Sequence, residues 1–577
     1  MAQRAEILNS PRWHLRRASW QDLAATVLVL GMLIVVGSGA HQMAAPFATA
    51  PPHISLSPAA LPYYTLQTTM RMFIAITVSL AFTFVYATLA AKSRRAEAIL
   101  IPLLDVLQSV PVLGYLSFTA LFFISAFPGR ALGPELAAIF AIFTSQAWNM
   151  AFSLYQSLRT VPRDLDDAGR SLRFSAWQRF WRVEVPFALP GLVWNTMMSM
   201  SAGWFFVVAS EAITVDGLNI RLPGVGSYVA EAIRQHDLAA VGWAILAMSA
   251  AILCYDQLVF RPLVAWSGRF QVPAQPAARG PRSWVLEIFQ RSHLLQQLIR
   301  PAATGLQEAG RARLSLPAHV HAAGKRLAAS RLTAALWYGL LCSSLVYILV
   351  RSVGFARIAL SWSDVVAATR SGMLTLLRVI VLVAVATVVW VPVGIVIGLK
   401  PKLTRMIQPA AQFLAAFPAN LLFPLAVFFV VRMHLAPAVW LSPLMILGAQ
   451  WYILFNVIAG ASAFPQDLRE AAASLRIRGW RWWRDVMLPG ILPYYVTGAI
   501  TASGGAWNAS IVSEVVRWGP TELTAGGLGA YIARMTEAGD LPRAALGIAV
   551  MAILVIAMNR LLWRPLYAFS ERRMRFD

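Results

Sequence analysis

The feature that most constrains this chain is an internal repeat with a constant offset of 303 residues, which we call the repeat offset. Segment 161–191 falls on segment 464–494 when the sequence is shifted by that amount, and the register continues without a gap to "RPL" in both copies. Matched pairs include Pro162 with Pro465, Trp177 with Trp480, Glu211 with Glu514 and Tyr228 with Tyr531. Any fold of this chain must therefore contain two related halves.

Long apolar runs recur in both copies, for example at 23–39, 73–91 and 379–399. A helix of that length crosses the roughly 30 Å hydrocarbon core of a bilayer. Only 13% of the residues are charged, against about a quarter in soluble domains. The sequence predicts an all-α, polytopic membrane protein.

Each half is predicted to contain about six membrane-spanning helices, or about twelve in all. Since six is even, both halves would insert in the same direction, related by a pseudo-twofold axis along the membrane normal. The first half is assigned to 1–264 and the second to 331–577. We expect the spans near 21–42, 61–91, 99–127, 133–158, 186–213 and 238–264, and near 332–354, 370–399, 405–432, 436–461, 489–516 and 541–567.

The formal net charge of +23 would suggest nucleic acid binding in a soluble protein, but in a membrane protein it reflects Lys and Arg on the cytoplasmic side. Placing the N-terminus inside puts the basic loops 92–97 and 400–405 and the basic segment 265–330 in the cytoplasm, and the C-terminus with them. Segment 265–330 is expected to be a cytoplasmic linker with an amphipathic helix near 284–300. The expected partner is a lipid bilayer, not nucleic acid.

Two polar loops are among the best-matched parts of the repeat. We call them the first repeat loop (162–186) and the second repeat loop (465–489). Each begins with proline followed by an aspartate, continues as a short amphipathic helix, and ends in an Arg/Trp segment suited to lipid headgroups. Such loops are either ordinary basic loops or surfaces on which another protein pushes. Their matched polar residues favour the second interpretation.

The second repeat loop, "EAAASLRIRGWRWWRDVMLPGILP", resembles the EAA loop of ABC importer permeases, and "DDAGRSLRFSAWQRFWRVEVPFALPG" resembles a diverged copy of it. Downstream, "SEAI" with "GVGSY" and "SEVV" with "GGLGAY" resemble the branch that imports nitrate, sulfonates, taurine or bicarbonate. The resemblance implies the type I importer permease fold, with one chain supplying both membrane halves in a bacterial inner membrane.

The resemblance also implies two separate ATPase subunits, which bind ATP and Mg and grip the repeat loops, and an extracytoplasmic solute-binding protein. Arg173 and Arg476 stand where the family has glycine, and the first loop opens with a poorer helix former, so the two surfaces are expected to be unequal. The implied ATPase-coupling residues are Asp164, Asp167, Ala168, Gly169, Arg173, Asp467, Glu470, Ala471, Ala472 and Arg476.

Three pairs of residues, one from each half in corresponding spans, are candidates for the translocation pathway. Arg71 and Arg378 lie early in the second span of each half, where they either face a cavity that attracts anions or reach toward outer headgroups. Glu211 and Glu514 either pair with these arginines or shape a gate beside Trp204 and Trp507. Polar groups inside apolar spans either line the pathway or join helices; they are Gln146, Asn149, Asn195 and Asn508.

The chain contains no P-loop motif and no histidine pair with metal-ligand spacing. We therefore expect no catalytic residue, no metal and no cofactor on this chain. The favoured function is the permease of an ATP-driven importer of a small anion. The alternatives are an ion-gradient-driven secondary transporter with parallel repeats, and a membrane scaffold or signalling component that works through its linker.

Overall fold

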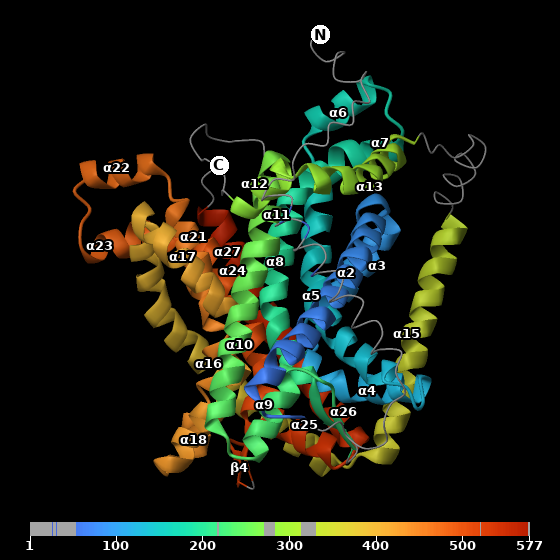
Figure 1. The fold of residues 1–577 in the computed structure, drawn as a ribbon, viewed down its shortest axis with the longest axis vertical. Helices are drawn as coiled ribbons and strands as arrows, with labels where there is room; N and C mark the ends of the chain where they lie inside the picture. The colour runs from blue at the N-terminus through green and yellow to red at the C-terminus, as the bar shows by residue number, and fades with distance from the viewer. Residues whose placement is uncertain are drawn as a thin grey trace.

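The computed structural model describes residues 54–215, 218–270, 283–312, 331–519 and 521–574, together with Leu23, Thr26 and Gly31. The helix expected near 21–42 lies almost wholly outside the described residues. The rest form a bundle of long helices with short helices at both ends (Figure 1).

The first half is built from long helices joined by short ones and one hairpin. In chain order it contains α2 (Leu61–Lys92), α3 (Arg94–Leu107), α4 (Val112–Ala126), α5 (Leu132–Arg159), α6 (Arg163–Ser171), α7 (Ala176–Arg179), α8 (Val185–Ser210), β1 (Ala212–Val215), β2 (Leu218–Arg221), α9 (Val225–Arg234), α10 (Leu238–Tyr255) and α11 (Arg261–Ser267).

The second half repeats this order. Applying the repeat offset to the bounds of α6, α8, β1, β2, α9 and α10 yields those of α22, α24, β3, β4, α25 and α26, so the predicted repeat is a repeat of structure. The elements are α16 (Trp362–Gly398), α17 (Pro401–Ala416), α18 (Phe423–Arg432), α19 (Pro437–Trp440), α20 (Leu444–Leu447), α21 (Gln450–Ser462), α22 (Gln466–Ser474), α23 (Trp480–Trp482), α24 (Leu488–Ser513), β3 (Val515–Trp518), β4 (Thr521–Thr524), α25 (Leu528–Glu537), α26 (Leu541–Met558) and α27 (Arg564–Met574).

The two antiparallel hairpins are additions to the predicted all-helical order. In the first, Ala212 pairs with Arg221 and Val215 with Leu218; the second repeats this register with Val515 opposite Thr524. Each hairpin joins the end of a long helix to a short helix (α9 or α25) and so holds that helix against the bundle.

Three of the predicted spans are bent rather than continuous. The bends are 101° between α3 and α4, 79° between α17 and α18, and 43° between the α19–α20 segment and α21. Pro111 and Pro418 precede the second member of the first two pairs; a proline lacks an N–H and forces the residue before it out of helical geometry. The described residues contain seven helices apolar and long enough to cross a membrane, or ten if each bent pair is one span.

The helix expected near 332–354 forms as α15 (Arg331–Ala359), which is not among those ten. It stands apart from the bundle in Figure 1. The expected linker helix forms as two helices, α12 (Trp284–Arg291) and α13 (His293–Arg311), interrupted at Ser292.

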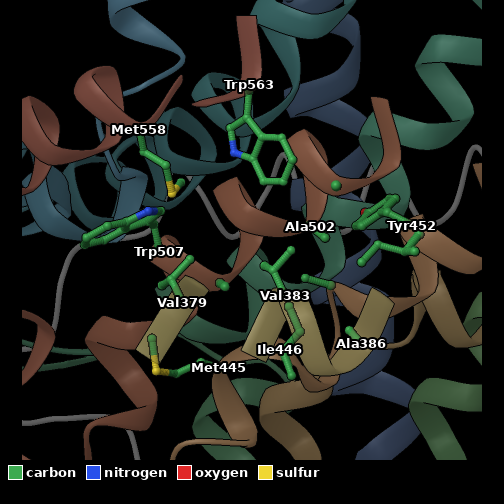
Figure 2. Packing of buried hydrophobic residues seen from close by; sticks show 14 of the residues in the cluster. Val379, Val383, Ala386, Met445, Ile446, Tyr452, Ala502, Trp507, Met558 and Trp563 are labelled. Carbon is green, nitrogen blue, oxygen red and sulfur yellow. The ribbon is translucent and has the colours of Figure 1, made fainter. Parts of the chain in front are cut away.

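The largest buried cluster joins the two halves. Figure 2 shows its second-half part, where Val379 and Val383 of α16 face the same interior as Trp507 of α24. Val112, Leu116 and other α4 residues of the first half belong to the same cluster. α4 packs against α24 and α26, while α17 packs against α8 and α10, so each half lends a bent segment to the other.

Candidate functional site: two buried arginine centres and two repeat loops

The candidate residues lie at opposite ends of the bundle. α6 and α22, the helices of the repeat loops, lie at one end, which we call the loop end; α18, β4 and α25 lie at the other, which we call the hairpin end (Figure 1).

Arg71 of α2 is the centre of a buried ion-pair network in the first half. Its Nε and Nη2 donate to the two carboxylate oxygens of Glu135 at 2.6 and 2.7 Å, and its Nη1 donates to Glu211 at 2.7 Å and to the Pro223 carbonyl at 2.9 Å. Arg71 is 1% exposed and Glu211 is 0% exposed. The guanidinium is thus fully engaged by the chain itself, and it ties α2 to α5 and to the end of α8.

Glycines enclose the Glu211 carboxylate. The Gly226 N–H donates to its Oε2 at 2.7 Å, and a Cβ at Gly226 would lie 2.1 Å from the carbonyl oxygen of Val208. At Gly224 a Cβ would meet the Glu211 carboxyl carbon at 2.3 Å. The "GVGSY" motif therefore lets α9 lie directly on the end of α8, with the carboxylate sealed between them.

The second half contains a looser version of the same centre. Arg378 of α16 contacts Glu514 at 3.2 Å and donates to the backbone carbonyls of Gly526 and Ala525. The hydroxyl of Thr375 donates to Glu514 at 2.8 Å. Arg378 has one acidic partner where Arg71 has two, because the second half has no counterpart of Glu135 among the described ion pairs.

These contacts bring the predicted pairs together: Arg71 with Glu211, and Arg378 with Glu514. Sequence reasoning missed Glu135. Trp204 and Trp507 do not join the centres, although each is almost fully buried. Trp507 lies in the cluster that joins the two halves, and Trp204 lies in a cluster made mostly of first-half residues. Trp204 packs edge-on against Tyr255.

An axial cavity lies between α8 and α24. We call it axial because equivalent stretches of α8 and α24 both line it. The lining residues that the repeat offset relates are Ala202 with Gly505, Phe205 with Asn508, and Phe206 with Ala509. Asn508 also accepts a hydrogen bond from the Val112 N–H at 2.8 Å, which satisfies the first amide of α4 at the bend. Of the polar groups considered in the spans, Asn508 is the one on this cavity.

The repeat loops present matched residues to solvent. Gly169 and Ala472 are buried against the segment that follows each helix, and a Cβ at Gly169 would lie 3.4 Å from the Arg179 side chain. The other predicted coupling residues are exposed, namely Asp164, Asp167, Ala168, Arg173, Asp467, Glu470, Ala471 and Arg476. Leu172 and Leu475 at the helix ends are also exposed, 65% and 73%.

Arg173 and Arg476 occupy a left-handed backbone conformation, with φ of 53° and 52°. The Arg173 N–H donates to the Arg170 carbonyl and the Phe174 N–H donates to the Gly169 carbonyl, at 2.9 and 3.0 Å. This is the Schellman arrangement, in which glycine is the usual residue. The two arginines thus stand where glycine would relieve strain.

The linker contacts one repeat loop. The indole N–H of Trp177 donates to the Ala309 carbonyl and the Gln178 amide donates to the Arg311 carbonyl, both at 2.7 Å. Both acceptors are carbonyls in the last turn of α13, where a helix leaves carbonyls without intrahelical partners, and the Ala309 carbonyl also accepts from the Ala312 N–H at 3.3 Å. The equivalent residue in the second loop, Trp480, is 71% exposed. The sequence held no signal of this contact.

Within the part of the chain that the structure describes, no group of three or more His, Cys, Asp or Glu side chains is arranged to hold a metal ion.

The chain matches the family described as "Binding-protein-dependent transport system inner membrane component" over residues 83–260 and again over 390–576. The two matched ranges together cover more than half of the chain and contain both repeat loops.

Individual relatives match shorter stretches. The bicarbonate transport system permease protein CmpB of Synechococcus elongatus is 33% identical over 136 residues, 24% of this chain and 48% of the relative. The nitrate import permease protein NrtB of Leptolyngbya laminosa is 26% identical over 35% of this chain and 66% of its own length. The taurine transport system permease protein TauC of Escherichia coli is 26% identical over 35% and 69%. The chain spans about half the length of the first of these relatives.

Proposed function

The chain belongs to the family of binding-protein-dependent transport system inner membrane components, and we propose that it is the permease of an ATP-driven importer of a small anion. One chain supplies both membrane halves. The substrate class follows relatives named for bicarbonate, nitrate and taurine, which are small anions or carry an acidic group.

The observation that carries the proposal is the matched pair α6 and α22. Both helices project from the loop end, and both expose the same positions, 164, 167 and 168 in one and 467, 470 and 471 in the other. Each also exposes a leucine at its C-terminus. An isolated exposed leucine needs no explanation, but two in equivalent places beside acidic residues suit docking to two copies of one protein.

Each helix is proposed to receive one ATPase subunit, which binds ATP and Mg. The loop end then faces the cytoplasm, and both termini lie on that side of a bacterial inner membrane, in keeping with the basic loops. A solute-binding protein would deliver the anion at the hairpin end. Closure of the ATPase dimer would push α6 and α22 and change the width of the axial cavity.

Arg71 and Arg378 then serve the pathway indirectly. Their donors are taken by Glu135, Glu211, Glu514 and backbone carbonyls, so in this conformation substrate contact falls to other side chains. We assign them the role of fixing α9 and α25 against the long helices, which keeps the hairpin end rigid.

Co-purification with the ATPase subunit tests the proposal. Glu470→Lys reverses a charge at the exposed face of α22, and Asp167→Lys does so at the equivalent position of α6; each is expected to weaken ATPase association. Glu287→Lys, an exposed acid in α12, is the matched control and is expected to leave the association intact. An unaffected Glu470→Lys complex, or no ATPase with the unaltered chain, would reject the proposal.

The two alternatives make opposite predictions. A secondary transporter moves anions in liposomes without any ATPase. A scaffold loses function when most of the linker is deleted and tolerates charge reversal in both repeat loops.

A further inference from the structure

A second cavity, of about 430 Å³, opens at the hairpin end between the two halves. β1, β2 and α9 of the first half and α18 and β3 of the second half supply its walls. Its lining contains three arginines, Arg221, Arg234 and Arg517, and no aspartate or glutamate. We call it the arginine cavity.

The arginines of the first half carry an excess positive charge. Arg221 and Arg234 share one acid: Glu231 accepts from Arg221 at 2.6 Å and from Arg234 Nε at 2.9 Å. Hydrogen bonds from Arg234, Gln235 and Arg221 lower the pKa of Glu231 to about 2, so it stays ionised. Two cations against one buried anion leave one net positive charge on this wall.

The wall from the second half is electrically balanced. Arg517 pairs with Glu522 at 2.9 Å and with Glu537 at 2.6 Å, and Arg534 lies 3.6 Å from Glu522. Glu537 is the equivalent of Arg234 under the repeat offset. The positive excess therefore belongs to the first half and is not a consequence of the repeat.

Few side chains separate the arginine cavity from the axial cavity. Asn420 and Phe423 line the arginine cavity, and the Asn420 side chain donates to the Phe205 carbonyl at 3.2 Å. The Asn420 Oδ1 is buried and has no hydrogen-bond partner among the described residues. Phe205 itself lines the axial cavity. Asn420 and Phe205 therefore separate the two cavities.

We infer that the arginine cavity binds a small oxyanion at the mouth of the pathway, before the anion passes the layer formed by Asn420 and Phe205. Planar guanidinium groups match the oxygen pairs of carboxylate, nitrate or sulfonate groups. The inference rests on the proposed function, since it names where the proposed substrate first meets this chain.

The same positive surface would also attract an acidic surface of a binding protein. The structure favours the small anion for two reasons. The charged groups line a hollow, and the Arg221 side chain is only 24% exposed, whereas those of Arg234 and Arg517 are 62% and 46% exposed. A flat protein surface would reach Arg234 and Arg517 but not Arg221, while a small anion can reach all three.

Cysteine labelling of the full chain in liposomes tests this, in a background where the exposed Cys254 and Cys342 are replaced by alanine. Ala230→Cys places a thiol on the cavity wall. Ala533→Cys is the matched control, because it is the equivalent residue under the repeat offset, is similarly half-buried and lies outside the cavity. Each thiol is reacted with an anionic and with a cationic methanethiosulfonate of similar size.

The ratio of the labelling rate with the anionic reagent to that with the cationic reagent is expected to be about tenfold higher at position 230 than at position 533. Arg234→Gln should remove most of that preference and Arg234→Lys should keep it; Arg234 is largely exposed, so either change is compatible with folding. Nitrate added at constant ionic strength should slow labelling at position 230 alone.

Equal reagent preference at the two positions, or a preference unchanged by Arg234→Gln, would overturn the inference. Protection of position 230 by an added binding protein but not by nitrate would also overturn it, in favour of a protein-docking surface. The labelling needs neither ATPase nor transport. It can therefore succeed where co-purification fails, or fail where co-purification succeeds.

Discussion

Replacing Arg71 by methionine is expected to destabilise the fold more than the same change at Arg378. Arg71→Met removes the partner of two buried carboxylates, Glu135 and Glu211. Breaking a buried ion pair by removing one partner costs about 3–5 kcal/mol, because an uncompensated charge stays in a low-dielectric site. Both acids lose their partner here, so we expect the upper part of that range.

Arg378→Met leaves only Glu514, which keeps hydrogen bonds from Thr375 at 2.8 Å and from the Ala530 N–H at 3.1 Å. The lost contacts are one ion pair and two bonds to carbonyls. The expected cost is about 3 kcal/mol, the lower end of the range for breaking a buried ion pair, because Glu514 keeps its hydrogen bonds from Thr375 and Ala530.

The assay is the apparent unfolding temperature of each variant in the same detergent, scanned at one rate because membrane proteins of this size unfold irreversibly. The apparent unfolding temperature is expected to be highest for the unaltered chain, lower for Arg378→Met and lowest for Arg71→Met. Adding Glu135→Gln and Glu211→Gln to Arg71→Met should recover part of the loss, since a neutral network no longer buries unpaired charge.

The reasoning is refuted if Arg378→Met lowers the unfolding temperature as much as Arg71→Met. It is also refuted if Arg71→Met keeps the unfolding temperature but abolishes transport. That second result would show that Arg71 contacts substrate instead of holding the fold together.

Three further changes have expected outcomes. Arg476→Gly relieves a left-handed backbone conformation that costs roughly 1–2 kcal/mol, but glycine adds about 0.5–1 kcal/mol of conformational freedom to the unfolded chain. The net stabilisation is therefore up to about 1.5 kcal/mol, so hydrogen exchange at the end of the loop should slow by up to about twelvefold; faster exchange would contradict this. Trp177→Phe removes the donor to α13 and should speed tryptic cleavage of the linker about fivefold, whereas Trp480→Phe should not change it. Gly226→Ala forces a Cβ against a carbonyl oxygen and should lower the unfolding temperature, while Gly242→Ala, in open space, should leave it unchanged.

The repeat made much of the fold predictable. Shifting the bounds of α8 by the repeat offset yields those of α24, so an element recognised in one half was placed in the other. The two hairpins were not predicted, because a strand of four residues is too short to show a hydrophobic period that distinguishes it from a loop. The bends in the membrane spans were not predicted either, because a continuous apolar run predicts one straight span even where a proline interrupts the helix.

The ion-pair centres were predictable in part. The repeat offset carries Arg71 to Leu374, one helical turn before Arg378, yet both arginines lie early in their spans and pair with the matched Glu211 and Glu514. Glu135 was missed for two reasons. Its equivalent, Ala438, carries no charge, so a search for matched residues passes over it; and an acid in the first turn of a helix reads as an ordinary helix start.

The exchange of bent helices has a consequence for biosynthesis. The first amide of α4, at Val112, is satisfied by Asn508, 396 residues further along the chain. At synthesis rates of about 5–20 residues per second, roughly 20–80 s separate the two. During that interval the first half sits in the bilayer without the wall that α24 and α26 will provide for α4. The first half made alone would therefore lack the packing partners of α4. Because both halves are in one polypeptide, each first half is made with one second half, in the same membrane and close to it.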